Sequence, residues 1–268
     1  MGRKNIWDII DNQEVDIYNE YNSLWDLFHT RNLIKIPNRR YPLTFEEIIK
    51  DNFLKFKSRG STTSYDDFLN VLKLSPRNYE IGSTLEGLDL LIELILLVFS
   101  ELYNLKVPYL DSGVGIVLDT INSVLEKTNQ KKILLEDKKI IVVPNDEAVT
   151  TVADLILPDD EKLALEVLGY SHYSNKNNLI EKRKILNSLA NYIEPKLKLK
   201  QNGEIGFVLN NYYIRHGNET NKQNVNELSD EDMNSLYDKL YRDILYYLLE
   251  QEHEDFKDLV KKLKKTFK

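Results

Sequence analysis

Apolar residues recur at helical spacing over most of this chain, and one region breaks that pattern. Apolar positions three and four residues apart predict helices at 6–28, 44–56, 64–74, 114–127, 146–156, 158–170, 179–199, 204–216 and 230–256. The segments 132–135 and 139–143 are instead rich in β-branched residues and are separated by three charged residues, which predicts a single β-hairpin. The pattern therefore predicts a mainly α-helical protein with one small hairpin.

One segment, residues 84–106, is apolar on nearly every face of the helix it would form. A helix of that kind belongs at the centre of a domain, because no face of it gains from contact with water. We therefore expect a multi-helix bundle around this buried central helix, with Leu91, Leu94, Ile95 and Val98 in the core.

A possible domain boundary lies near residues 107–112, where Pro108 and a turn follow the predicted central helix. A helical N-terminal region would then span 1–107, and the hairpin with a second helical bundle would span 108–268. A single domain over the whole chain fits the same pattern. No repeat of fixed length is present, so a solenoid is not expected.

Composition excludes several classes of function. The 268 residues carry a formal net charge of −7, which does not suit a general binder of duplex DNA. There is no Cys, so thiolate nucleophiles, disulfides and Cys-based metal sites are excluded. The nearest two of the four His, His216 and His253, are 37 residues apart, and no Gly-rich phosphate loop occurs. We expect neither a metal nor a cofactor.

No segment has the apolar length of a signal peptide or a membrane span. The most apolar stretch, Leu88–Phe99, is interrupted by Asp89 and Glu93. We therefore expect a cytoplasmic protein with no membrane contact.

Candidate chemistry gathers in the segment Leu209–Asn221, at the end of a predicted helix. It brings together Asn210, Asn211, Arg215, His216 and Asn218. A guanidinium among amide side chains can bind a phosphate or a carboxylate through two hydrogen bonds. Arg215 and His216 are therefore the candidate catalytic residues, and the three Asn are candidate binding residues.

The segments 182–195 and 206–218 together resemble bacterial helical proteins of the HEPN type, which are grouped with abortive-infection, phage-defence and toxin systems. The resemblance extends over about residues 140–250. It implies an RNA-directed helical module that can act as a homodimer. HEPN ribonucleases carry an Arg, a polar residue and a His four to six positions after the Arg. Here Arg215 is followed by His216, but positions 219–221 contain no His.

We accordingly expect a module of a bacterial defence or stress system that binds RNA or a partner protein. In one alternative it is a metal-independent endoribonuclease, where Arg215 would stabilise the charge developing on phosphorus and His216 would transfer protons. In the other it is a scaffold protein of a mobile element with no active site.

Some of these residues also have simpler explanations. Arg215 and His216 could be cations that stabilise the last turn of a helix ending before Gly217. Lys182 and Arg183 begin a basic run that could bind RNA phosphates or could form an ordinary solvated helix face. The basic, amphipathic tail at 257–268 could be an arm for RNA or for an acidic partner, or a set of helix-end lysines.

Overall fold

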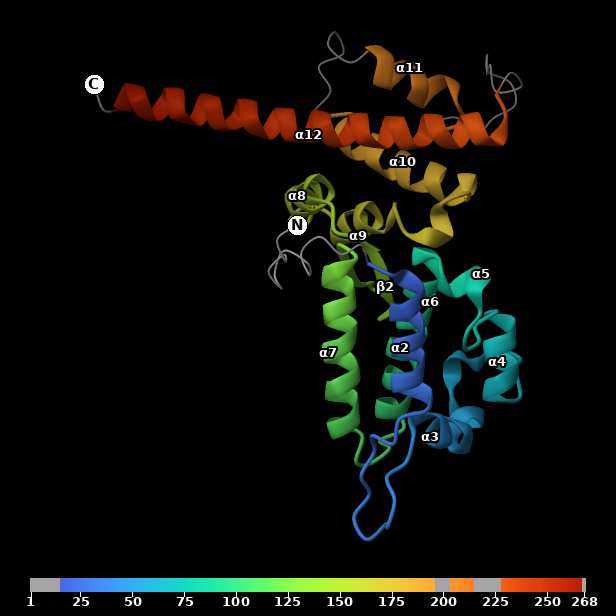
Figure 1. Cartoon of the computed structure of the whole chain (residues 1–268). Coiled ribbons are helices and arrows are strands. Elements are labelled where there is room, and N and C mark those ends of the chain that lie inside the picture. The colour runs from blue at the N-terminus through green and yellow to red at the C-terminus, as the bar shows by residue number, and fades with distance from the viewer. Residues whose placement is uncertain (1–14, 196–202, 215–227, 267–268) are drawn as a thin grey trace, which may run out of the picture. The chain divides into compact units, whose positions relative to one another are not determined.

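Two separate hydrophobic cores organise the chain. The computed structural model describes residues 15–195, 203–214 and 228–266 (Figure 1). Among these residues, one compact unit comprises 15–134 together with 138–142, and the other comprises 135–137 and the described residues from 143 to 266. Helices dominate both units, and a two-stranded sheet of β1 and β2 lies between them in the sequence. This confirms the mainly α fold with one small hairpin.

The first unit contains most of the short helical elements. They are α2 (Ile17–His29), α3 (Phe45–Asn52), η1 (Phe53–Lys55), η2 (Lys57–Arg59), α4 (Tyr65–Val71), α5 (Tyr79–Gly82), α6 (Leu85–Asn104) and α7 (Asp111–Lys127). The strands β1 (Gln130–Leu134) and β2 (Ile140–Pro144) follow. The long helices α2, α6 and α7 lie side by side, with α2 in contact with both of the others (Figure 1).

Local capping explains where several of these helices begin. Thr44 and Glu47 form the predicted capping box: the Glu47 N–H donates to Thr44 Oγ1 at 3.1 Å, and the Thr44 N–H donates to Glu47 Oε2 at 2.8 Å. Ser64 and Thr84 cap α4 and α6 in the same way, each accepting from the backbone N–H three residues later.

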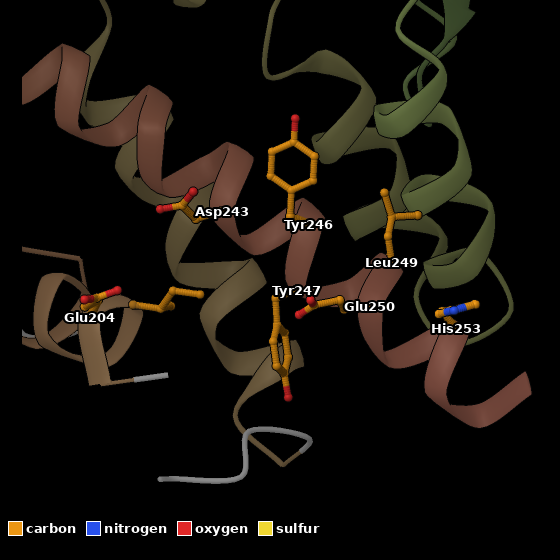
Figure 2. A pocket seen from close by; sticks show the side chains of 8 residues that line it. Glu204, Asp243, Tyr246, Tyr247, Leu249, Glu250 and His253 are labelled. Atoms are coloured by element: carbon orange, nitrogen blue, oxygen red, sulfur yellow. The ribbon is translucent and has the colours of Figure 1, made fainter. Parts of the chain in front are cut away.

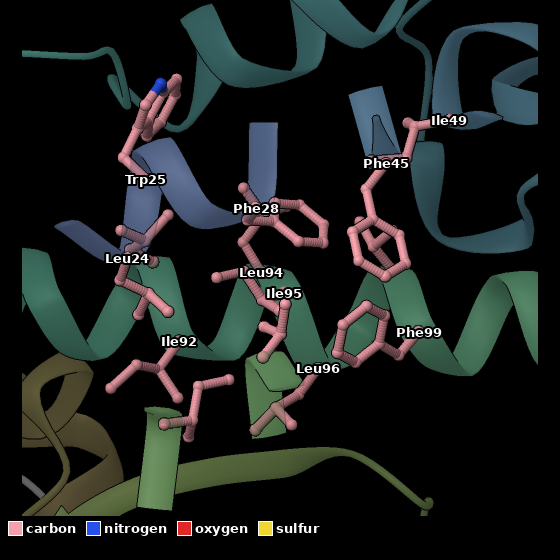
Figure 3. Close-up of a cluster of buried hydrophobic side chains, with 14 of the residues drawn as sticks. Leu24, Trp25, Phe28, Phe45, Ile49, Ile92, Leu94, Ile95, Leu96 and Phe99 are labelled. Carbon is pink, nitrogen blue, oxygen red and sulfur yellow. The ribbon is translucent and has the colours of Figure 1, made fainter. Parts of the chain in front are cut away.

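The predicted central helix is confirmed as α6, which lies at the centre of the first unit. Leu91, Leu94, Ile95 and Val98 are each at most 2% exposed. Aromatic rings from α2 and α3 pack on one side of the helix, where Phe28 stacks on Phe45 with ring centroids 5.2 Å apart (Figure 3). The core of the second unit contains no residue of α6, so α6 organises the first unit alone.

The carboxylates of α6 attach neighbouring segments to it. Asp89 Oδ2 accepts a hydrogen bond from the side chain of Gln130 at 3.1 Å, and Glu93 Oε1 accepts from the Val142 N–H at 2.7 Å. Glu101 accepts from the backbone N–H groups of Lys57 and Ser58. The charges that interrupt this apolar helix therefore fix the hairpin and η2 in place.

The division between the units falls within the hairpin region and not at the boundary expected near residues 107–112. Helix α7 packs against α2 and contributes Val114, Val117 and Ile121 to the first core. Because the apolar face of α7 is buried there, residues 108–134 belong with the helices that precede them.

The second unit is a bundle built around α10 and α12. Its elements are α8 (Glu147–Ile156), α9 (Glu161–Gly169), η3 (Tyr173–Asn175), α10 (Leu179–Ile193), α11 (Gly203–Asn211) and α12 (Asp230–Thr266). Helix α12 contacts α8, α10 and α11 (Figure 1). The rings of Tyr170 and Tyr241 stack with centroids 3.8 Å apart, and the Tyr241 hydroxyl donates to the Val167 carbonyl at 2.8 Å.

The C-terminal ends of α11 and α12 are among the helix ends that differ from those predicted. Helix α11 ends at Asn211 and not at His216, because Tyr213 adopts a positive φ of 60° that an α-helix cannot continue through. Helix α12 continues ten residues beyond Phe256, to Thr266. No Gly or Pro interrupts that stretch, and the pairs Lys257–Glu254 and Lys261–Asp258 support it at i, i+3 spacing.

Candidate functional site

The two candidate catalytic residues, Arg215 and His216, lie outside the described residues, as does Asn218. The structure does bear on the helix in which they were expected. Helix α11 ends at Asn211, and residues 212–214 are not helical. The expectation of one helix running through residues 204–216 is therefore wrong.

The two described Asn of this segment lie near the end of α11. Asn210 is exposed to solvent. The Asn211 side-chain amide donates to the backbone carbonyl of Phe207 at 2.7 Å. That carbonyl lies four residues earlier, one turn back along the same helix. The hydrogen bond gives Asn211 a local structural role within α11.

Lys182 is not part of a solvated basic face, and the structure corrects that expectation. Its side chain is buried, and its Nζ donates to Asp238 Oδ1 at 2.6 Å and to Asn234 Oδ1 at 2.8 Å. The ammonium group also lies 5.5 Å from the centre of the Tyr170 ring. A lysine held in this way is not available to bind RNA phosphates.

The burial of Lys182 follows from its place on α10. Ile185, Leu186, Leu189 and Ile193 are all buried, and they lie three, four, seven and eleven positions after Lys182. These spacings place Lys182 on the core-facing side of the helix. The same spacing is present in the sequence, and it predicts the buried position of Lys182 better than the charges of the adjacent residues do.

Arg183, the next residue, lines a small pocket of about 220 Å³. Tyr213, Asp230 and Tyr237 line it as well, together with apolar residues from the starts of α10 and α12. Burial is the main cause of a raised Tyr237 pKa, and the nearby Arg183 charge partly opposes it. Arg183 thus shares the lining of this pocket with one acidic residue, Asp230.

A larger groove lies between α11 and α12, and the sequence analysis did not find it. It has a volume of about 630 Å³. The described residues that line it are Glu204, Ile205, Asp243, Tyr246, Tyr247, Leu249, Glu250 and His253. Figure 2 shows Glu204 on the helix that faces α12, and Tyr246 and Tyr247 pointing to opposite sides of α12. Among these residues there are three carboxylates and neither Lys nor Arg.

The helix geometry accounts for the composition of the groove. Asp243, Tyr247 and Glu250 lie on one face of α12, because they are spaced by four and three residues. Opposite them, Ile205 and Leu209 are buried and anchor α11 against the core. The Tyr237 hydroxyl donates to the Tyr212 carbonyl at 3.0 Å, which holds the end of α11 on α12.

Chemically, the groove combines an apolar base with an acidic rim. Ile205 and Tyr247 are 8% and 6% exposed, whereas Glu204, Asp243 and Glu250 are exposed to solvent. Carboxylates in this arrangement attract a cationic group and repel a phosphate. Across the described ranges, no cluster of His, Asp and Glu has the arrangement of a metal site.

Comparison with known proteins gives no neighbour. No family model matches the chain, and neither a curated protein nor a solved structure is similar to it. Among the described residues, no helix has both the length and the apolar character needed to cross a membrane.

Proposed function

We propose that this protein is a helical binding module that accepts a positively charged, amphipathic segment of a partner protein in the groove between α11 and α12. The observation that carries the proposal is the convergence of Glu204, Asp243 and Glu250 around the buried Ile205 and Tyr247. Lys or Arg side chains of the partner would pair with the carboxylates, and its apolar side chains would cover the base of the groove.

A partner protein fits this groove better than RNA does. RNA binding requires cations placed along a phosphate backbone. Of the basic residues expected to serve that purpose, Lys182 is paired with Asp238, and Arg183 lines the smaller pocket together with Asp230. The rim of the larger groove is acidic. The resemblance of residues 182–218 to HEPN-type proteins supports placing this module in a cytoplasmic defence or stress system of a bacterium.

Fluorescence anisotropy with defined probes tests the proposal. The probes are a labelled helical peptide with Lys at i, i+4 spacing on one face and Leu on the other, the same peptide with Glu in place of Lys, and a single-stranded RNA. We expect the full-length protein to bind the lysine peptide with an affinity that falls with added salt. The glutamate peptide and the RNA should bind at least about tenfold more weakly.

The double variant Asp243→Asn/Glu250→Gln should weaken binding of the lysine peptide by about tenfold or more. The matched control is Asp119→Asn/Glu126→Gln, which removes two exposed carboxylates seven residues apart on α7, the spacing of Asp243 and Glu250. The control should bind as the unmodified protein does. Equal weakening in both double variants, or tighter binding of RNA than of the lysine peptide, would overturn the proposal.

A further inference from the structure

The C-terminal part of α12 extends past the core of its unit. The last buried residue of the helix is Leu248, yet the helix continues to Thr266 (Figure 1). We refer to residues 249–266 as the α12 extension. Apolar side chains in it are exposed to an unusual degree: Phe256 is 59% exposed, Leu259 53% and Leu263 49%. Exposed apolar side chains gathered on one element mark an interaction surface.

Three exposed side chains form one stripe on the extension. Phe256 and Leu263 are seven residues apart, and Leu259 lies between them at i+3 from Phe256. That is the spacing of the a and d positions of a coiled coil. One heptad before Leu259 the d position is Glu252, and Leu249, one heptad before Phe256, packs against the core of the unit. Between Phe256 and Leu263, the stripe has the geometry to pack against one other helix.

Charge along the extension changes sign from one end to the other. Residues 250–258 contain five acidic side chains and one lysine, whereas residues 259–266 contain four lysines and no acid. Two copies placed side by side in parallel would put like-charged ends together. Two copies placed antiparallel would put each acidic end against a basic end.

We propose that the α12 extensions of two copies of this chain pair antiparallel and form a homodimer. The a and d positions of antiparallel helices pack against each other, which sets Phe256 of one copy beside Leu259 of the other. In that register Asp255 lies opposite Lys262 of the second copy. The two-fold symmetry repeats both contacts, so one surface supplies both halves of the interface.

The order of acidic and basic residues along the extension also favours a second copy of this chain over a membrane surface as its partner. An amphipathic helix that lies on an anionic bilayer is basic along its polar face. Here Glu250, Glu252, Glu254 and Asp255 would face the same anionic surface as the lysines. A second copy offers opposite charges to both the acidic and the basic end of the extension, whereas an anionic membrane attracts only the basic end.

Sedimentation equilibrium of the full chain, from about 1 to 200 µM, tests for the dimer. We expect Leu259→Glu/Leu263→Glu to raise the dimer dissociation constant by at least about tenfold. The matched control, Leu54→Glu/Ile180→Glu, changes two side chains that are 67% and 72% exposed elsewhere, and it should dimerise normally. A protein that is monomeric throughout this range would overturn the proposal, and binding to vesicles of anionic phospholipid through the stripe would then identify a membrane surface as its partner.

Charge reversal tests the antiparallel register itself. Asp255→Lys alone places lysine against lysine, and Lys262→Asp alone places acid against acid, so each variant should dimerise poorly. A mixture of the two variants restores both pairs and should form a heterodimer. Failure of the mixture to associate, when the unmodified chain dimerises, would overturn the register.

The absence of Cys allows a single spin label to be attached at Lys265→Cys. The two labels of an antiparallel pair would lie roughly 22 Å apart along the helix axis, from the rise of 1.5 Å per residue. Labels of a parallel pair would have almost no axial separation, and a distance measurement with that result would also contradict the proposal.

Discussion

The ammonium group of Lys182 lies 2.6 Å from Oδ1 of Asp238, and this contact joins α10 to α12 within the second unit. The lysine side chain is only 4% exposed, whereas that of Asp238 is 36% exposed. The Tyr170 hydroxyl donates to the same carboxylate oxygen at 3.1 Å. The carboxylate of Asp238 thus accepts hydrogen bonds from a buried ammonium group and from a buried phenol. The sequence had led us to expect a basic binding face at Lys182.

Replacement of Lys182 tests this structural role. Lys182→Met keeps the length of the side chain and leaves Asp238 without its ammonium partner. We expect the free energy of unfolding to fall by about 1–3 kcal/mol, less than for a fully buried pair, because water still reaches Asp238. The matched control is Lys184→Met, since Lys184 is 58% exposed and pairs with Glu181 on the surface. It should change stability by under about 0.5 kcal/mol in the same urea titration.

Leu94 tests the central position of α6. It is 2% exposed, and Leu94→Ala removes three carbon atoms from a packed core. We expect a loss of about 2–5 kcal/mol in the free energy of unfolding, from the lost transfer free energy and the cavity that remains. Leu54→Ala, at a position that is 67% exposed, should have little effect. An unfolding midpoint unchanged by Leu94→Ala would contradict the core assignment.

The elements with purely local signals were predictable from the sequence. Thr44 with Glu47 forms the predicted capping box, and the all-apolar segment 84–106 is the buried helix α6. In both cases the determining groups are within a few turns of one another in the chain. The groove was not predictable in this way, because Glu204 and Asp243 meet only once α11 packs on α12.

Two errors have a physical reason that generalises to other sequences. The charges adjacent to Lys182 predict an exposed side chain. Its spacing to the buried Ile185 and Leu189 instead places the side chain on the core-facing side of α10. The end of α11 was assigned to Gly217 because Gly is the usual residue at such ends. The chain instead takes a left-handed conformation at Tyr213, which a sequence does not signal for a bulky residue.

His29 predicts a dependence of stability on pH. Its Nε2 lies 2.9 Å from the Tyr65 hydroxyl, and its Nδ1 lies 3.2 Å from the Trp25 carbonyl. Burial is the main cause that lowers the His29 pKa to about 4. The unfolded chain, with an ordinary His pKa of about 6.5, binds a proton first as the pH falls, so this contribution is present above pH ~6.5 and is lost toward pH ~4.

We expect His29 to reduce the free energy of unfolding by about 2 kcal/mol between pH 7 and pH 5, since each unit of pKa difference corresponds to about 1.4 kcal/mol. Urea titrations of the unmodified protein and of His29→Gln at both pH values measure it. Gln removes the titrating group, so the variant should lose less stability over this interval. Identical pH dependence in the two proteins would show that His29 does not contribute.

Arg215 carries the remaining prediction that rests on the sequence alone. If the chain cleaves RNA as HEPN-type ribonucleases do, the unmodified protein should cut single-stranded RNA in the presence of EDTA. Arg215→Lys should then lower the cleavage rate by about 100-fold or more, because Lys cannot supply two parallel hydrogen bonds to one phosphate.

The same substitution separates this role from that of a simple helix-end cation. A dipole partner tolerates Lys, so in that case stability should change by under about 1 kcal/mol and any measured activity should be retained. Thermal unfolding of Arg215→Lys provides the control, since the fold should be intact in either case. An Arg215→Lys variant that cleaves RNA at the unmodified rate would contradict the catalytic role. An unmodified protein with no cleavage at all would exclude the ribonuclease alternative and leave the binding groove between α11 and α12 as the functional site to pursue.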